Sequence, residues 1–225
     1  MNPEIHQRKD SFDLMKNKDL TGQRCARIAV LVSGGGTNLQ ALIDAEKSGI
    51  LRSGRIVLVV SNKSDAYALR RAVAAGIPTE VVTVGDYGKD GIEKRIAELL
   101  EDYSVDLIVL AGFMQILSAD FTKRYDHRII NIHPSLIPSF CGPGFYGLRV
   151  HRAALEKGVK VTGATVHFVN EIPDGGEIIM QKAVNVRVCD TPESLQSRVM
   201  RLAEWKILPK AVEKISKQII SKENG

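Results

Sequence analysis

The chain has 225 residues, of which 44% are hydrophobic, and it carries a formal net charge of +5 at pH 7. A chain of this length favours one domain with a sizeable core. No apolar run approaches the roughly 20 residues that cross a bilayer, and the N-terminal sequence has no apolar stretch typical of a secretory signal, so no membrane contact is expected. The dispersed basic residues and the 5% aromatic content argue against a nucleic-acid partner.

The three cysteines, Cys25, Cys141 and Cys189, lie far apart in the sequence. Their spacing fits neither a zinc site nor a disulfide framework, so we expect no metal and a reducing compartment, the cytoplasm. The modest positive charge suits small anionic substrates.

Residues 1–26 are polar and show no sustained periodicity. We expect them to form a flexible N-terminal extension. No internal repeat or low-complexity linker divides the remainder, so residues 27–225 are predicted to form a single domain.

Strands and helices alternate in the first part of this domain. An apolar run at 28–32 is followed by the glycine turn "SGGGTN" and by a helix whose apolar residues share one stripe. Further strands are expected at 56–60, 77–84, 105–113 and 128–133, and further helices at 65–75 and 91–103. This alternation predicts an α/β fold with a doubly wound, mostly parallel sheet.

The pattern changes after His133. A helix near 147–157 is followed by two longer strands, 159–169 and 176–186, which predict an antiparallel C-terminal addition to the sheet. The final helix begins either with Asp190 or with Thr191 as its N-cap. Pro209 is expected to kink or break that helix.

Ligands of open α/β sheets bind at the carboxyl ends of the strands, where the sequence places the glycine turn. Three glycines allow close backbone approach, and the helix that opens at Thr37 and Asn38 offers free N–H groups to an anion. We therefore predict a phosphate cradle at Gly35, Gly36, Thr37 and Asn38. A plain strand–helix turn is the alternative.

Asn131 and His133 end the strand at 128–133. Residues two apart in a strand face the same way, so both side chains can point into one small volume. An amide can donate to a developing oxyanion, and an imidazole can move a proton near neutral pH. From the strand alone, polar groups that meet solvent or cap the next helix are an equal alternative.

Asp174 lies in the tight loop "NEIPDGG". An ordinary turn aspartate is the simpler interpretation of that stretch, and a carboxylate that orients His133 or holds a catalytic water is the alternative. His167 is expected to be a core histidine or one that supports the site from behind. Cys141 is expected to be a small loop residue rather than a nucleophile.

Five motifs carry a resemblance to a known family: "VLVSGGGTNLQALIDA", "SNKSDAYALRRA", "DLIVLAGFMQILS", "INIHPSLIPSF" and "TVHFVNEIPDGG". Over residues 27–212 the chain resembles the folate-dependent phosphoribosylglycinamide formyltransferases. The resemblance implies formyl transfer from 10-formyltetrahydrofolate to the amine of glycinamide ribonucleotide, without a metal.

The resemblance also implies roles for individual residues. Asn131, His133 and Asp174 match the catalytic group of the family, and Glu204 joins the glycine cradle in binding the ribose phosphate. The residues that match folate contacts are Lys89, Met114, Gln115, Ile116, Leu117, Asn170, Glu171, Ile172, Pro173 and Asp174. Gln115 stands where the family often has arginine, and the loop after Phe140 is longer than usual, without a histidine at 149.

Several alternatives stay open at this stage. Formyltetrahydrofolate hydrolase shares the three catalytic residue types, and another amine could be the acceptor. A methionyl-tRNA formyltransferase would need an RNA-binding domain after residue 225, and a non-catalytic binding module would not need all three catalytic residues. We expect a monomer or a homodimer that takes only small-molecule substrates.

Overall fold

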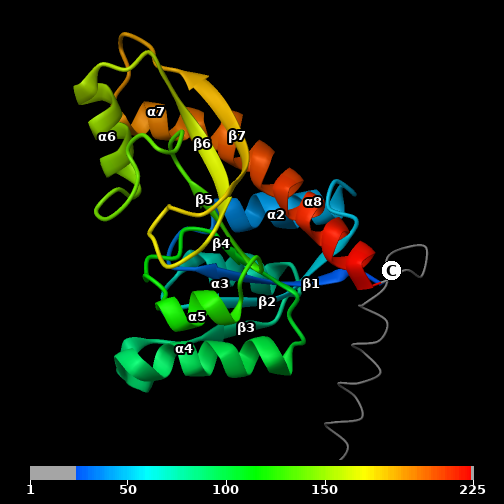
Figure 1. Cartoon of the computed structure of the whole chain (residues 1–225). Helices are drawn as coiled ribbons and strands as arrows, with labels where there is room; N and C mark the ends of the chain where they lie inside the picture. Colours follow the sequence, from blue (N-terminus) through cyan, green and yellow to red (C-terminus); the bar gives the residue numbers. More distant parts are fainter. Residues whose placement is uncertain (1–23, 224–225) are drawn as a thin grey trace, which may run out of the picture.

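The computed structural model describes residues 24–223 and contains one seven-stranded sheet (Figure 1). The strands are β1 (Ala26–Val32), β2 (Gly54–Ser61), β3 (Thr79–Val81), β4 (Leu107–Leu110), β5 (Ile129–His133), β6 (Val161–Phe168) and β7 (Ile178–Asn185). Their order across the sheet is β3-β2-β1-β4-β5-β6-β7.

The first five strands pair in parallel, and β6 pairs antiparallel with both β5 and β7. The predicted fold class, a doubly wound and mostly parallel sheet with an antiparallel C-terminal addition, is therefore confirmed. The strand order reverses direction between β1 and β4, which is where open α/β sheets bind their ligands.

Helices cover both faces of the sheet. They are α2 (Thr37–Lys47), α3 (Tyr67–Ala74), α4 (Val84–Asp102), α5 (Ala119–Arg124), α6 (Leu148–Lys157), α7 (Pro192–Val199) and α8 (Trp205–Glu223), with a π-helical turn, Met200–Glu204, between the last two. Helices α4 and α5 lie on one face, and α2 and α8 lie on the other (Figure 1). Helices α6 and α7 lie beside β6 and β7 (Figure 1).

The core follows the alternation of side chains along β1. Ile28, Val30 and Val32 pack with the α2 and α8 side, while Ala29 and Leu31 pack with the α4 and α5 side. All five side chains are fully buried. A strand covered on both faces explains the continuous apolar run in the sequence and fixes the glycine turn that follows it.

The ordered domain starts earlier than predicted. Arg24 pairs with Asp106, Cys25 is buried, and Ala26 is the first residue of β1. These three residues belong to the domain and not to the predicted N-terminal extension, 1–26. The rest of that predicted extension, residues 1–23, lies outside the described residues.

The C-terminal helices correct one prediction and settle another. Thr191, not Asp190, is the N-cap of α7: its side chain accepts a hydrogen bond from the Ser194 backbone, and Pro192 occupies the first helical position. Of the kink or break expected at Pro209, the break is wrong, because α8 continues through this residue. Helical irregularity occurs earlier, in the π-turn at 200–204, and buried contacts of Leu208 and its neighbours hold α8 together.

Candidate functional site

A pocket of about 560 Å³ opens at the carboxyl ends of β1, β4 and β5. Its lining includes most of the residues predicted from the sequence: Thr37, Asn38, Met114, Gln115, Ile116, Leu117, Asn131, His133, Asn170, Glu171, Pro173, Asp174 and Glu204. Gly35, Gly36 and Ile172 border these segments without lining the pocket. Lys89 lies on α4 and is not part of the lining.

Strand β5 places Asn131 and His133 on the same side, as their spacing predicts. His133 is only 4% exposed, and its Nδ1 lies 3.4 Å from the Asp174 carboxylate. Its Nε2 lies 2.9 Å from the carbonyl oxygen of Phe140, which can only accept, so Nε2 carries a proton. In the neutral ring Nδ1 then holds the lone pair and can take up a proton beside Asp174.

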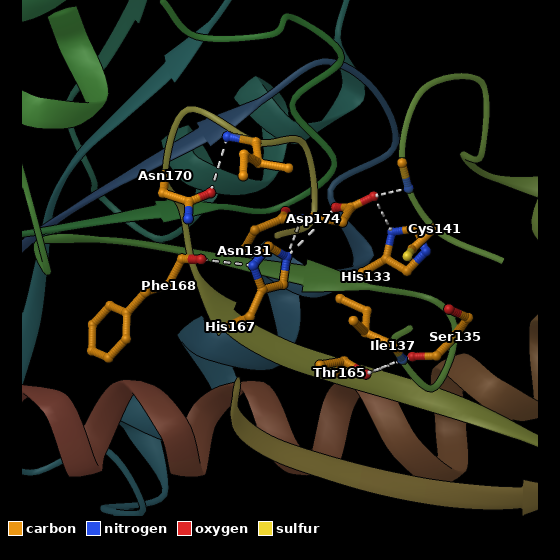
Figure 2. Close-up of polar contacts among 12 residues, drawn as sticks. Asn131, His133, Ser135, Ile137, Cys141, Thr165, His167, Phe168, Asn170 and Asp174 are labelled. Atoms are coloured by element: carbon orange, nitrogen blue, oxygen red, sulfur yellow. Dashed lines mark hydrogen bonds and ion pairs between the residues drawn. The ribbon is translucent and has the colours of Figure 1, made fainter. Parts of the chain in front are cut away.

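Asp174 approaches from the loop between β6 and β7. Figure 2 shows its carboxylate between the rings of His133 and His167. The backbone N–H of Gly142 also donates to it, at 2.8 Å. Burial opposes ionisation of Asp174, but the contacts with His167, His133 and Gly142 together keep its pKa below the usual value. The carboxylate is therefore ionised at neutral pH.

His167 belongs to this group and supports it from behind, which is one of the two roles expected from the sequence. Its Nδ1 donates to the carbonyl oxygen of Phe168 at 2.7 Å, so Nε2 is free to accept a hydrogen bond from the Asn131 amide at 3.2 Å. Strand β6 pairs Asn131 directly with His167. The expectation of a histidine behind the site agrees with this geometry, because His167 orients Asn131 and faces Asp174.

Burial is the main influence on the protonation of His133. It lowers the pKa of the ring, the Asp174 charge and the Phe140 carbonyl act in the opposite direction, and His167 lowers the pKa further. His151 on α6 is fully buried nearby, and burial together with His133 lowers its pKa to about 4. Both rings are thus neutral at pH 7 before substrate binds, and His133 is available as a base.

The glycine turn has the geometry of an anion cradle. Gly36 is the N-cap of α2, with φ 70°, and no side chain caps the helix. A Cβ atom at Gly36 would lie 2.6 Å from the Cβ of Ala68 on α3, so only glycine fits between the two elements. The N–H groups of Gly36 and Thr37 have no hydrogen-bond partner within residues 24–223.

Glu204 lies next to the cradle, where the π-turn at 200–204 places it. It is 6% exposed, and Asn38 donates to its Oε2 at 2.7 Å. Burial raises the pKa of Glu204 to about 7, and the hydrogen bond from Asn38 opposes this only in part. The side chain can therefore act as a hydrogen-bond donor or acceptor near neutral pH.

The loop after β4 forms an apolar wall of the pocket. Met114 and Ile116 line the pocket and are 51% and 72% exposed, so large apolar side chains are open to solvent here. The Ser33 hydroxyl, at the end of β1, accepts a hydrogen bond from the Met114 backbone at 2.8 Å. The loop at 170–174 lines the pocket as well.

In residues 24–223, no three His, Cys, Asp or Glu side chains are grouped so that they could hold a metal ion. In the same part of the chain no helix is long and apolar enough to cross a membrane.

A model of the formyl transferase family matches residues 26–212. The chain belongs to the formyl transferase family. Among relatives of this family, the phosphoribosylglycinamide formyltransferase of Haemophilus influenzae is 44% identical over 184 residues, which cover 81% of this chain and 84% of that protein. The crystal structure of glycinamide ribonucleotide transformylase 1 from Symbiobacterium toebii has a TM-score of 0.82 and 40% identity, and the match covers 90% of this chain and 93% of that one.

The trifunctional purine biosynthetic protein adenosine-3 of Gallus gallus is 48% identical over 191 residues, which are 84% of this chain and 18% of that protein. The chain thus spans about a fifth of the length of such trifunctional relatives. The resemblance inferred from the five sequence motifs is confirmed by these matches.

The loop at 142–147 forms a third wall of the pocket. Residues 142–147 line it, and Gly142, Gly144 and Gly147 all have positive φ. Cys141 donates to the carbonyl oxygen of Pro138, and burial together with Asp174 raises the pKa of its thiol. A raised pKa does not suit a nucleophile, in agreement with the prediction of a loop residue.

Proposed function

We propose that this chain transfers the formyl group of 10-formyltetrahydrofolate to the amine of N1-(5-phosphoribosyl)glycinamide, a step of de novo purine biosynthesis. The observation that carries the proposal is the meeting of Asn131, His133 and Asp174 in one pocket that Thr37 and Glu204 also line. Family membership and the names of the relatives that cover most of both chains support the same activity.

The ribonucleotide binds through the cradle in this proposal. The free N–H groups of Gly36 and Thr37, at the N-terminus of α2, suit a phosphate, and Gly35 and Asn38 complete the turn around it. Glu204 meets the ribose hydroxyls, for which a buried carboxyl group offers both donor and acceptor atoms.

The folate binds between residues 114–117 and 170–174. Exposed Met114 and Ile116 suit a flat ring that would remove their side chains from water. A volume of about 560 Å³ lies within the usual range of ligand pockets. A role for Lys89 at the outer end of the folate rests on the family resemblance alone.

The folate supplies an electrophilic formyl carbon and a nitrogen leaving group. Asn131 has a second amide N–H beyond the one that contacts His167, and it donates this to the oxygen that becomes negative when the amine bonds to the formyl carbon. His133 accepts at Nδ1 the proton that the amine loses, and Asp174, 3.4 Å away, stabilises the imidazolium. As the bond to the leaving nitrogen breaks, His133 gives that nitrogen the proton, so the protein returns to its starting state.

A formyl-transfer assay with three acceptors tests the proposal. We expect formylation of glycinamide ribonucleotide to exceed that of free glycinamide and the release of formate to water. Equal or faster formate release would identify a hydrolase instead. Transfer to glycinamide at the same efficiency would remove the phosphate cradle from the proposal.

The remaining predictions about partners accompany this proposal. The substrates are small molecules, and neither a metal nor a nucleic acid is required for the steps above. A monomeric or homodimeric state and a cytoplasmic location stay predictions from the sequence.

A further inference from the structure

The carbonyl groups of Gly34 and Gly35, in the glycine turn, point toward α3. The backbone N–H of Ala68 donates to the carbonyl oxygen of Gly34 at 3.0 Å, and Nε of Arg71 donates to that of Gly35 at 2.9 Å. In a trans peptide the C=O and the following N–H point in opposite directions. The N–H of Gly36 is therefore directed away from Arg71 and α3.

Arg71 is itself held in place. Its Nη1 donates to the side-chain oxygen of Gln40 on α2 at 3.0 Å, and its guanidinium lies 5.0 Å from the ring centre of Tyr67. Gln40 in turn donates its backbone N–H to the carbonyl oxygen of Gly36. Arg71 thus contacts the turn directly and also through α2, whereas its neighbour Arg70 is exposed and makes neither contact.

Among the described residues, Arg71 donates the hydrogen bond that the carbonyl oxygen of Gly35 accepts. A Cβ atom at Gly35 would meet nothing within 4 Å, so the space on that side of the residue is open. Glycine also has wide backbone freedom, and a peptide between two glycines can rotate easily. In the orientation that carries the hydrogen bond from Arg71, the Gly36 N–H is free.

We propose that Arg71 is a positioning residue for the phosphate of the ribonucleotide. It turns the peptide between Gly35 and Gly36 so that the Gly36 N–H faces the phosphate, and its positive charge adds to the field of the α2 N-terminus. The inference rests on the proposed function, because it takes the cradle to be the phosphate site. It concerns only the ribonucleotide and predicts no effect on folate binding.

Arg71→Met tests the inference, with Arg70→Met as the matched control on the same helix. We expect Arg71→Met to raise the KM for glycinamide ribonucleotide about tenfold, the effect of one lost charge-assisted hydrogen bond, with kcat and the KM for 10-formyltetrahydrofolate unchanged. Activity on N-ribosylglycinamide, which lacks the phosphate, should be equal in wild type and both variants. Arg71→Gln replaces the first variant if that one does not fold.

Two results would overturn the inference: a KM for the ribonucleotide within twofold of wild type in folded Arg71→Met, or an equal loss with the phosphate-free substrate. Amide NMR of the wild-type protein titrated with ribose 5-phosphate distinguishes an error about Arg71 from an error about the phosphate site. Unmoved signals of Gly36 and Thr37 would show that the cradle is not the phosphate site. Shifted signals with normal KM in Arg71→Met would refute the role of Arg71 alone.

Discussion

Single residues of the site differ in how well the sequence reveals them. Asn131 and His133 were predictable as a pair, because strand geometry places residues two apart on one side. Asp174 could not be assigned from its own loop, since turn aspartates are common and only the fold brings it to His133. The contact of His167 with Asn131 is not predictable from the sequence, because it depends on the register between β5 and β6.

Replacing Asn131 by alanine tests the proposed oxyanion donor. We expect Asn131→Ala to lower kcat by roughly 10²- to 10³-fold, the usual effect of losing one such donor, with little change in either KM. Steady-state kinetics on protein of normal melting temperature provide the measurement. Asn185→Ala, at the exposed end of β7, is the control, and a kcat within a few-fold of wild type would exclude Asn131 from catalysis.

Glu204 makes the stability of the folded protein depend on pH. Its pKa is about 7 in the folded protein against an ordinary value of 4.5, so the folded state binds more protons between these values and stability falls as pH rises through them. We expect the free energy of unfolding to fall by about 3 kcal/mol in total, with the loss complete above pH 7. Glu204→Gln, which cannot ionise, should be free of it.

Urea unfolding of wild type and Glu204→Gln at pH 5 and pH 8 measures this difference. The variant should gain stability relative to wild type between the two pH values. A constant difference would mean that Glu204 stays ionised in the fold.

Among the elements, strong apolar patterns predicted structure well and short segments did not. The six-residue helix α5 was missed because it has too few apolar positions to show a period. The strand expected at 77–84 is only Thr79–Val81, because Thr83 caps α4 and the chain turns into that helix. Pro209 did not break α8, since tertiary packing outweighed the local preference.

The hydrogen bond between Ser33, at the end of β1, and Met114, in the loop after β4, links two elements of the fold. Ser33→Ala removes the acceptor of the Met114 N–H and should loosen the 114–117 loop. We expect the KM for 10-formyltetrahydrofolate to rise several-fold while the KM for the ribonucleotide changes less, because one hydrogen bond contributes about 1 kcal/mol. Ser48→Ala is the control, because the Ser48 hydroxyl donates to the carbonyl oxygen of Ala45 in its own helix. A larger effect on the ribonucleotide would contradict this assignment of the two subsites.

In the whole molecule, the topology of the sheet brings together segments that local sequence patterns cannot connect. The cradle, the end of β5 and the loop before β7 are up to about 140 residues apart, yet the doubly wound order places them around one pocket. The alternation of strands and helices was enough to predict that order of layers. It could not predict the walls made by residues 142–147 or the burial of Glu204, which depend on how α6 and the π-turn pack.

In the proposed reaction one pocket holds both substrates at once, with Asn131, His133 and Asp174 between them. Calorimetric binding of a compound that joins the glycinamide nitrogen of the ribonucleotide through one carbon to the N10 position of a folate analogue tests this directly. Once one half of the compound is bound, the other half is already close to its own site. We therefore expect the joined compound to bind at least ~100-fold more tightly than the better of its two halves alone. Binding no tighter than that half would show that the two substrates do not bind side by side in this pocket.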